Sequence, residues 1–227
     1  MKPLYPIFLD ISDRLCVVIG GGPVAERRVG GLLDAHARVR VVCLTATERL
    51  QQWAAMGRIE LRMEPFQPVH LDDAMLVFAV TNEHTVNEEV ARSAKERNLL
   101  VNVADAPEQG HFIVPSVVRR GDLCLCVATG GQQPKLTAQI ADELAERYGT
   151  EYEKLLQLLG KLRSEILTAT ATDPQLRQEA LERLHEQTPK LLAMIRAELD
   201  PEPEARAVLN QLLRPWLSQS SPKEGQR

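Results

Sequence analysis

A glycine-rich turn near the amino terminus constrains the fold more than any other feature of this sequence. Residues 20–25 read G-G-G-P-V-A and fit the pattern G-x-G-x-x-A. The turn follows a continuously apolar run at 15–20 and precedes 24–37, where apolar residues recur at helical spacing. A glycine turn between a buried strand and a helix is typical of folds that bind the pyrophosphate of a dinucleotide. The sequence therefore predicts dinucleotide binding at this turn.

Each small residue of the motif has a physical role. Gly20 permits the tight turn, Gly22 lets the backbone approach a pyrophosphate, and Ala25 lets the helix pack closely against the sheet. The free N–H groups and the positive dipole end of the helix would then face the phosphates. The alternative, a glycine-rich turn without a ligand, stays open because a glycine pattern by itself is weak evidence.

The first 105 residues alternate strand-like and helix-like patterns. Further strand-like runs lie at 39–44, 59–63, 75–80 and 99–104, and helical patterns lie at 47–56 and 85–97. Continuous apolar strands separated by helices indicate a parallel sheet that is covered on both faces. We therefore expect an α/β fold with a Rossmann-type, doubly wound parallel sheet.

The pattern changes after this region. Two short strands are expected around a turn at 120–122, followed by a helix at 135–148, and the prolines beyond residue 150 fall near expected helix starts. The helical segments expected there are 151–168, 174–187, 189–199 and 203–217. The predicted domains are a dinucleotide-binding domain at 1–113, a small α+β segment at 114–149, a helical domain at 150–217 and a disordered tail at 218–227.

Composition argues against several classes of protein. A net charge of −4 and an aromatic content of 4% do not suit a nucleic-acid-binding surface. The sequence has neither a run of about 18 apolar residues nor a signal-peptide pattern, so we expect a soluble, cytoplasmic protein without a membrane span. The cysteines lie in strand-like runs and are expected to be buried, reduced thiols, a metal or redox role being the alternative: Cys16, Cys43, Cys124 and Cys126.

Polar residues follow the fourth and fifth strand-like runs. Thr81 and Asn82 end the fourth run and Asp105 ends the fifth, at the edge where doubly wound folds place ligands. Thr85 is expected to cap the next helix, with Glu88 completing a capping box. From spacing alone, Asp105 is either a catalytic carboxylate or a solvated turn residue.

The sequence lacks the acidic residue that commonly binds the adenosine ribose about 20 positions after the glycine turn. The second strand-like run ends instead at Leu44 and Thr45, so backbone groups or Thr45 would hold the ribose. Arg49 could reach a 2′-phosphate, but no obvious arginine is placed to bind one. We therefore favour NAD over NADP.

Four segments together resemble the N-terminal module of the sirohaem synthase family, the precorrin-2 dehydrogenase/sirohydrochlorin ferrochelatases. They occur in the family's order and cover about residues 3–147: YPIFLDISDRLCVVIGGGPVAERR, TNEHTVN, NVADAPEQGHFIVPS and VATGGQQPKLTAQIADELAER. The resemblance implies an NAD-binding Rossmann domain, a central dimerisation segment and a helical C-terminal domain. It implies NAD⁺-dependent oxidation of precorrin-2 to sirohydrochlorin and, in many members, Fe²⁺ insertion at the same site to give sirohaem. The family's methyltransferase domain lies outside the match, so we expect this chain to lack that activity.

The resemblance also assigns site residues. The family's catalytic aspartate falls on Asp105, where a carboxylate could accept a proton as the nicotinamide accepts a hydride. Its cofactor contacts fall around Gly22, Pro23, Val24, Leu44 and Thr45. Thr129 occupies a position in the TGG motif that is serine in some relatives.

The tetrapyrrole substrate carries many carboxylates and therefore needs basic partners. Candidate basic residues are Arg27, Arg28, Arg119, Arg120 and Lys135. His111 could ligate iron or carry a proton, and His84 is a weaker candidate near the nicotinamide. No histidine–carboxylate cluster marks a permanent metal site, so iron would pass through as a substrate.

The helical part is expected to support a homodimer. Apolar side chains at helical spacing could face a second copy, or they could pack within their own core: Leu155, Leu158, Leu159 and Leu162.

The sequence bears on three other functions. A dehydrogenase without chelatase activity fits the sequence equally well. A non-catalytic sensor of NAD or tetrapyrroles is disfavoured because Asp105 is intact. A short-chain dehydrogenase is rejected because none of the three tyrosines begins a Tyr-x-x-x-Lys motif.

Overall fold

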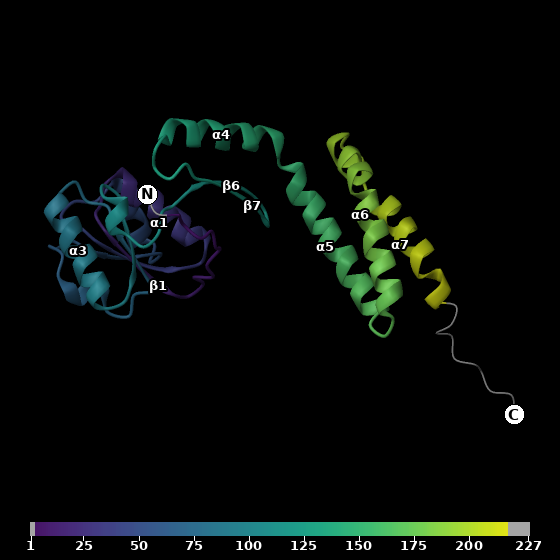
Figure 1. Cartoon of the computed structure of the whole chain (residues 1–227), viewed down its shortest axis with the longest axis horizontal. Helices are drawn as coiled ribbons and strands as arrows, with labels where there is room; N and C mark the ends of the chain where they lie inside the picture. Colours follow the sequence, from purple (N-terminus) through teal and green to yellow (C-terminus); the bar gives the residue numbers. More distant parts are fainter. Residues whose placement is uncertain (1–2, 218–227) are drawn as a thin grey trace, which may run out of the picture. The chain divides into compact units, whose positions relative to one another are not determined.

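A computed structural model describes residues 3–217 of the chain; the tail predicted at 218–227 lies outside the described residues. The chain divides into two compact units, Met1–Val114 and Pro115–Arg227 (Figure 1). The predicted subdivision of the second part at residue 150 stays a prediction.

The first unit contains a five-stranded parallel sheet with the strand order β3-β2-β1-β4-β5. Its strands are β1 (Leu15–Ile19), β2 (Arg38–Val42), β3 (Glu60–Arg62), β4 (Leu76–Ala79) and β5 (Leu100–Val103). The order reverses between β1 and β4, which is the topological switch point of a doubly wound sheet. The expected Rossmann-type fold is therefore confirmed.

Helices bury both faces of this sheet. They are α1 (Pro23–Asp34), α2 (Glu48–Ala55) and α3 (His84–Glu96), with short 3₁₀ helices η1 (Pro68–Leu71) and η2 (Pro107–Gln109). Cys16 and Val18 of β1 pack in the cluster shared with α1 and α2, whereas Val17 and Ile19 pack in the cluster shared with α3. Because both faces are buried, β1 is apolar at every position instead of alternating.

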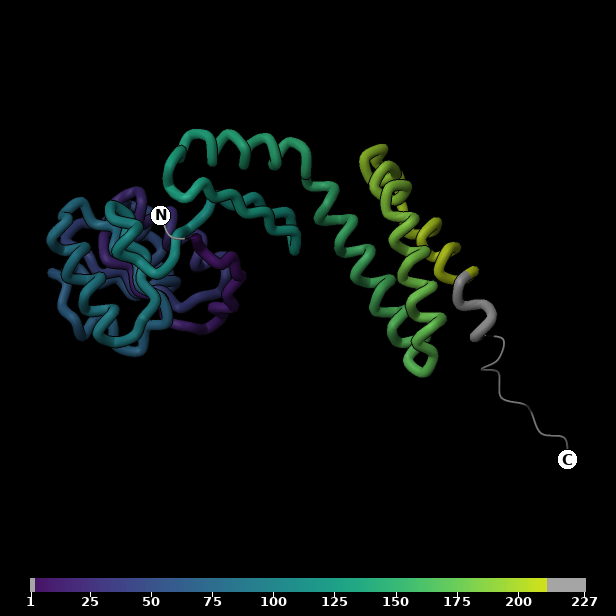
Figure 2. The backbone as a smooth tube through the Cα atoms, in the orientation of Figure 1, coloured from purple at the N-terminus to yellow at the C-terminus, as the bar shows by residue number. Residues whose placement is uncertain are grey.

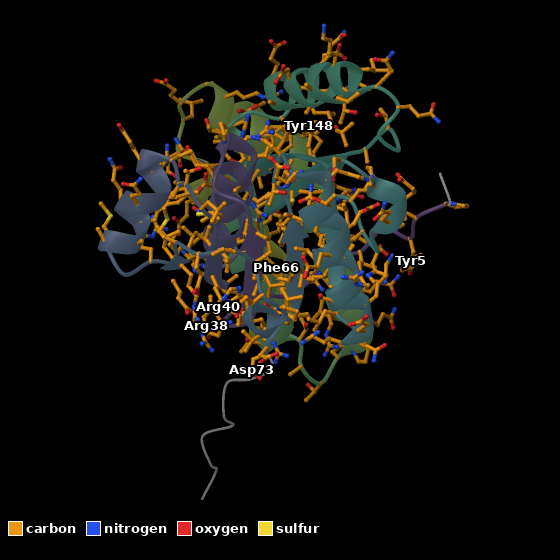
Figure 3. The ribbon with its side chains drawn as sticks, turned by 90° about the vertical axis from the view of Figure 1, so that its left-hand side faces the viewer. Tyr5, Arg38, Arg40, Phe66, Asp73 and Tyr148 are labelled. Carbon is orange, nitrogen blue, oxygen red and sulfur yellow. The ribbon has the colours of Figure 1, made fainter. Side chains whose placement is uncertain are left out.

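Strand β2 carries charged residues without disrupting this core. Arg38 and Arg40 both come from β2 and are labelled in Figure 3. The Arg40 guanidinium lies 2.8 Å from a carboxylate oxygen of Glu60 on β3 and donates to the carbonyl oxygen of His70 at 3.0 Å. These partners satisfy a mostly buried guanidinium, as such a group requires.

Helix α3 begins earlier than the sequence pattern indicates. Its N-cap is Glu83, which makes no side-chain capping hydrogen bond, so the predicted cap at Thr85 is wrong. Thr85 lies within the first turn of the helix. The Thr81 hydroxyl oxygen instead accepts from the Glu83 N–H at 3.2 Å, which turns the chain into the helix two residues sooner.

The second unit begins with an antiparallel hairpin of β6 (Ser116–Arg120) and β7 (Leu123–Val127). It continues with α4 (Pro134–Arg147), α5 (Glu151–Ala169), α6 (Pro174–Arg196) and α7 (Glu202–Leu217). Figure 2 shows α5 and α6 running antiparallel beside each other, and both also contact α7. The hairpin and the helix after it agree with the sequence prediction.

One continuous helix replaces two that the sequence predicts at 174–187 and 189–199. Helix α6 runs through Pro189, although an interior proline costs a helix about 3 kcal/mol. Leu184 and Leu191, on either side of it, are both buried in the core of α5, α6 and α7. Tertiary packing on both sides of the proline therefore outweighs its local preference for a helix start.

The same core settles how the apolar face of α5 is used. Leu155 and Leu162 are buried in it, and Leu158 and Leu159 pack against it. Leu155 and Leu162 therefore pack within their own unit, in agreement with the alternative interpretation of this pattern, and a role of the helical part in a homodimer stays a prediction. Among the helices described, none is sufficiently long and apolar to cross a bilayer.

The cysteine prediction holds for two of the four residues. Cys16 and Cys43 are buried, whereas Cys124 is half-buried and Cys126 is exposed, contrary to expectation. Cys124 and Cys126 share one face of β7, and β7 belongs to a two-stranded hairpin whose other face carries the buried Val118. Their Sγ atoms are 3.9 Å apart, and no group of three or more potential metal-ligating side chains occurs within residues 3–217.

Candidate functional site

The glycine turn passes between the ends of β2 and β4. Gly20 has a φ of +130°, and a Cβ added there would lie 2.7 Å from the carbonyl oxygen of Val80. A Cβ on Gly21 would overlap the carbonyl oxygen of Thr45 and would lie 2.7 Å from Sγ of Cys43. Glycine is therefore required at both positions, by the backbone angle at the first and by close approach at both.

Gly22 is different, because the space next to it is open. A Cβ added at Gly22 would meet no atom within 4 Å, and Gly22 is the N-cap of α1. The first N–H groups of a helix have no intrahelical partners, and they carry the positive end of the helix dipole. Ala25 is completely buried one turn further on, in agreement with its predicted packing role. The turn fits the pyrophosphate of a dinucleotide, with open space and free donors at the same place.

The other predicted cofactor residues lie at the same edge of the sheet. Leu44 and Thr45 follow β2, and Leu44 is 69% exposed. The backbone N–H of Thr47 donates to the carbonyl oxygen of Gly21 at 3.0 Å, which ties this segment to the glycine turn. An exposed leucine beside the turn provides an apolar surface for an adenosine. These contacts with the cofactor stay predictions.

Asp105 follows β5 at this edge, and two side chains of α3 hold its carboxylate. His84 Nδ1 lies 2.7 Å from Oδ2 of Asp105, and Asn87 Nδ2 donates to Oδ1 at 2.9 Å. The Asp105 side chain is 36% exposed, so the carboxylate is still accessible from outside. The structure thus gives this aspartate a fixed orientation, which a solvated turn residue would lack.

The amide of Asn87 is itself held in place. Asn87 is completely buried; its Nδ2 also donates to the Thr81 carbonyl at 3.0 Å, and its Oδ1 accepts from the Thr81 N–H at 3.1 Å and hydroxyl at 2.8 Å. Thr81, a predicted cofactor residue, therefore contributes to the support of Asp105. Asn82, its neighbour, is exposed.

The electrostatics of this cluster favour a positive charge on His84 and a negative charge on Asp105. Hydrogen bonding to Asp105, with the charge of Glu88, raises the pKa of His84 above its ordinary value. Burial acts to raise the pKa of Asp105, but the hydrogen bonds from His84, from its own backbone N–H and from Asn87 outweigh it and leave that pKa below its ordinary value. Asp105 is consequently a carboxylate at neutral pH.

His111 occupies a structural position beside β5. Its N–H donates to the Val101 carbonyl at 2.8 Å, and its Nδ1 accepts from the Val101 N–H at 3.2 Å. Both hydrogen bonds satisfy backbone groups of Val101 on β5, which is an outer strand of the sheet. A substrate role for His111 stays a prediction.

Two of the four predicted substrate arginines, Arg119 and Arg120, lie in the second unit, whereas Arg27 and Arg28 lie on α1 of the first unit. Arg120 donates from Nη2 to the carbonyl oxygen of Ala145 at 3.0 Å and from Nη1 to that of Arg119 at 2.9 Å, so it joins the hairpin to the end of α4. Arg119 is exposed and pairs with Cys124 across the hairpin. Arg119 is therefore the freer of the two guanidinium groups.

Two further candidates lie at the start of α4. The hydroxyl of Thr129 is 2.7 Å from that of Thr137, and Lys135 is exposed on the first turn of the helix. Substrate contacts of these residues stay predictions, as do those of both arginines.

The fold and the glycine turn define a dinucleotide-binding protein of the Rossmann type, and comparison with known proteins agrees. Residues 7–116 match the family model described as "Putative NAD(P)-binding". Siroheme synthase of Nitrosospira multiformis is 41% identical over 165 residues, which cover 71% of this chain and 35% of that protein. Siroheme synthase of Salmonella schwarzengrund is 36% identical over 167 residues, or 74% of this chain and 36% of that protein.

A solved structure extends the match. The protein named "SirC, precorrin-2 dehydrogenase" superposes with a TM-score of 0.75 at 26% identity, covering 93% of this chain and 100% of that chain. The chain is therefore similar to siroheme synthases over about seven-tenths of its length and to SirC over nearly all of it, in agreement with the sequence motifs. It spans about a third of the length of the curated siroheme synthases that it matches.

Proposed function

We propose that this chain is an NAD⁺-dependent dehydrogenase that oxidises precorrin-2 to sirohydrochlorin. The proposal rests on the ionised carboxylate of Asp105, which is hydrogen-bonded to His84 and Asn87. This carboxylate lies at the same end of the parallel strands as the glycine turn, where the space beside Gly22 is open. The similarity to siroheme synthases and to SirC, precorrin-2 dehydrogenase, supports the choice of substrate.

The chemistry divides between the cofactor and the chain. Bound NAD⁺ supplies the hydride acceptor. Oxidation of precorrin-2 removes one hydride and one proton, and the Asp105 carboxylate accepts that proton as a general base. The glycine turn and the start of α1 hold the pyrophosphate, and Leu44 and Thr45 flank the adenosine.

We propose NAD rather than NADP as the cofactor. The guanidinium of Arg49, the residue that could reach a 2′-phosphate, lies 5.1 Å from the ring centroid of Trp53 on the same helix. A guanidinium stacked on an aromatic ring has a favourable partner already. Parallel titrations with NAD⁺ and NADP⁺ test this choice, and tighter binding of NADP⁺ would contradict it.

The test of the main proposal is a direct assay. Purified protein is mixed with NAD⁺ and precorrin-2 without oxygen, and the formation of NADH and sirohydrochlorin is followed by absorbance. We expect one NADH for each sirohydrochlorin. Failure to accelerate NADH formation over the protein-free reaction would overturn the proposal.

We extend the proposal to Fe²⁺ insertion at the same site. Two pyrrole N–H protons leave as iron enters, and the Asp105 carboxylate can accept them one at a time, releasing the first to water before it accepts the second. Since residues 3–217 contain no cluster of three potential ligands, the tetrapyrrole nitrogens would hold the iron as a substrate. An insertion assay with Co²⁺ and sirohydrochlorin tests this step. If the protein does not raise the insertion rate above the protein-free rate, the chelatase proposal is wrong and only the dehydrogenase activity remains.

We also propose a homodimer. The amino-terminal segment exposes five apolar side chains, with exposed fractions from 42% to 87%: Leu4, Tyr5, Ile7, Phe8 and Leu9. A cluster of exposed apolar residues is typical of a protein interface. Sedimentation at micromolar concentration tests the proposal, since a purely monomeric protein would contradict it.

Finally, we propose a cytoplasmic location. All four cysteines are free, including the neighbouring Cys124 and Cys126. Free thiols are typical of reducing compartments. Cell fractionation tests the location.

A further inference from the structure

His84 lies between two carboxylates. Its Nδ1 is 2.7 Å from Oδ2 of Asp105, and its Nε2 is 3.2 Å from Oε1 of Glu88. A neutral imidazole carries one N–H and can donate to only one carboxylate, whereas an imidazolium carries two and can donate to both. The geometry therefore fits the charged form of His84.

The groups around His84 explain how a charge is stable there. Asp105 comes from the segment after β5, and Glu88 comes from the next turn of α3. His84 is the first residue of α3, and the positive end of a helix dipole disfavours a cation. The hydrogen bond to Asp105 and the charge of Glu88 oppose that effect, and the pKa of His84 is raised as a result.

Substrate binding changes the surroundings of Asp105. A tetrapyrrole that covers the site removes water from the carboxylate and brings further carboxylates near it. Both effects favour the protonated form of an aspartate, which cannot act as a base. The catalytic carboxylate therefore needs a nearby cation during the reaction.

We propose that His84 is a positioning residue for Asp105: as an imidazolium it fixes the orientation of the carboxylate and keeps it ionised beneath the polyanionic substrate. This inference rests on the proposed dehydrogenase function. Asn87 holds the other carboxylate oxygen with a neutral amide, so the positive charge comes from His84. The His84 side chain is 56% exposed, so its replacement should leave the fold intact.

One arm of the experiment needs no substrate. The His84 imidazole is titrated by nuclear magnetic resonance in the wild type, in Asp105→Asn and in Glu88→Gln. We expect the pKa of His84 to lie above 6.5, its ordinary value, in the wild type and to fall in each variant. An unchanged titration in Asp105→Asn would overturn the inference, even if precorrin-2 proved not to be the substrate.

The second arm measures kcat against pH with precorrin-2 and NAD⁺. His84→Asn keeps an N–H donor near the position of Nδ1 but loses the charge, while His84→Ala loses both. We expect the acidic limb of the kcat profile to move up by about one pH unit in His84→Asn, because the cation no longer favours the ionised form of Asp105. His84→Ala should show the same shift and a lower plateau, since orientation is lost as well.

A matched substitution controls for the loss of any histidine. His36 lies just before the amino end of β2, whereas Asp105 follows the carboxyl end of β5. The φ of His36, +57°, is one that asparagine tolerates. His36→Asn should leave the kcat profile and NAD⁺ affinity unchanged. Superimposable profiles of His84→Asn and the wild type would overturn the inference. If the wild-type protein is inactive on precorrin-2, the proposed function is wrong. The substrate-free titration of His84 then tests on its own whether His84 interacts with Asp105 as a cation.

Discussion

The amide of Asn87 donates to Oδ1 of Asp105 at 2.9 Å, and this hydrogen bond joins helix α3 to the segment that follows β5. The two residues are 18 positions apart in the sequence. Asn87 is completely buried and is also hydrogen-bonded to Thr81, so it contacts the carboxylate from the protein interior. His84 contacts the other carboxylate oxygen near the surface. One carboxylate is thus oriented by two different helix residues.

Loss of the Asp105 charge should separate catalysis from cofactor binding. Asp105→Asn keeps the size of the side chain but removes the base, so kcat should fall by about 10²-fold or more. The NAD⁺ dissociation constant, measured by fluorescence titration, should be nearly unchanged because the glycine turn is intact. A variant that keeps the wild-type rate of NADH formation would contradict the catalytic role.

Gly22 should tolerate a methyl group structurally but not functionally. Its φ is −85° and a Cβ would meet nothing within 4 Å, so Gly22→Ala should change the free energy of unfolding by about 1 kcal/mol or less. The same methyl group would occupy the space proposed for the pyrophosphate. Binding of NAD⁺ should therefore weaken by about tenfold or more.

Gly31, also on α1 with open space around it, provides the control. Gly31→Ala should stabilise the helix by about 0.5–1 kcal/mol and leave NAD⁺ affinity unchanged. Calorimetric titration of both variants distinguishes the two glycines, and equal affinities in the two variants would disprove the assignment of Gly22.

The His84–Asp105 pair should stabilise the folded protein within a limited pH range. The lowered pKa of Asp105 gives stability above the ordinary aspartate value of 3.8, and this stability is lost as the pH falls through the folded-state pKa. The raised pKa of His84 gives stability that is complete below 6.5 and is lost as the pH rises through the folded-state value.

The difference in Tm between the wild type and Asp105→Asn should consequently be largest between these two values and smaller on either side. Thermal unfolding from acidic to alkaline pH measures it. Asp142→Asn, the same chemical change at an exposed position of α4, should show no such maximum. A difference independent of pH would argue against the ion pair.

The core of the second unit should depend on Leu162. Leu162 is 1% exposed in the cluster formed by α5, α6 and α7, so Leu162→Ala should lower the free energy of unfolding by about 2–5 kcal/mol. Leu167 lies on the same helix but is 38% exposed, and Leu167→Ala should cost about 1 kcal/mol or less. Urea denaturation followed by circular dichroism compares them, and similar losses would contradict the described core.

Much of the fold followed from local sequence patterns. The glycine turn, the continuous apolar strands and the intervening helices predicted the doubly wound sheet, because strand and helix periodicities depend on neighbouring residues. The same order of elements placed Asp105 at the carboxyl edge of the sheet, since parallel strands all end there.

Predictions that depended on a single local signal were less secure. Thr85 looked like a helix cap and Pro189 like a helix start, but a turn at Thr81 and packing beside Pro189 decided otherwise. Cys126 lies in an apolar run yet is exposed, because a two-stranded hairpin has a face that the core does not cover. Local preferences of this size are overruled by tertiary contacts.

The sequence by itself determined the class of fold, the place of the cofactor turn and the aspartate that a reaction could use. Only the tertiary structure decided that His84 and Asn87 hold that aspartate and that His84 also reaches Glu88. The physical reason is distance along the chain: His84 and Asp105 are 21 residues apart, and no local periodicity relates them. They meet because β4 and β5 are neighbouring parallel strands, so the helix that follows one lies beside the segment that follows the other.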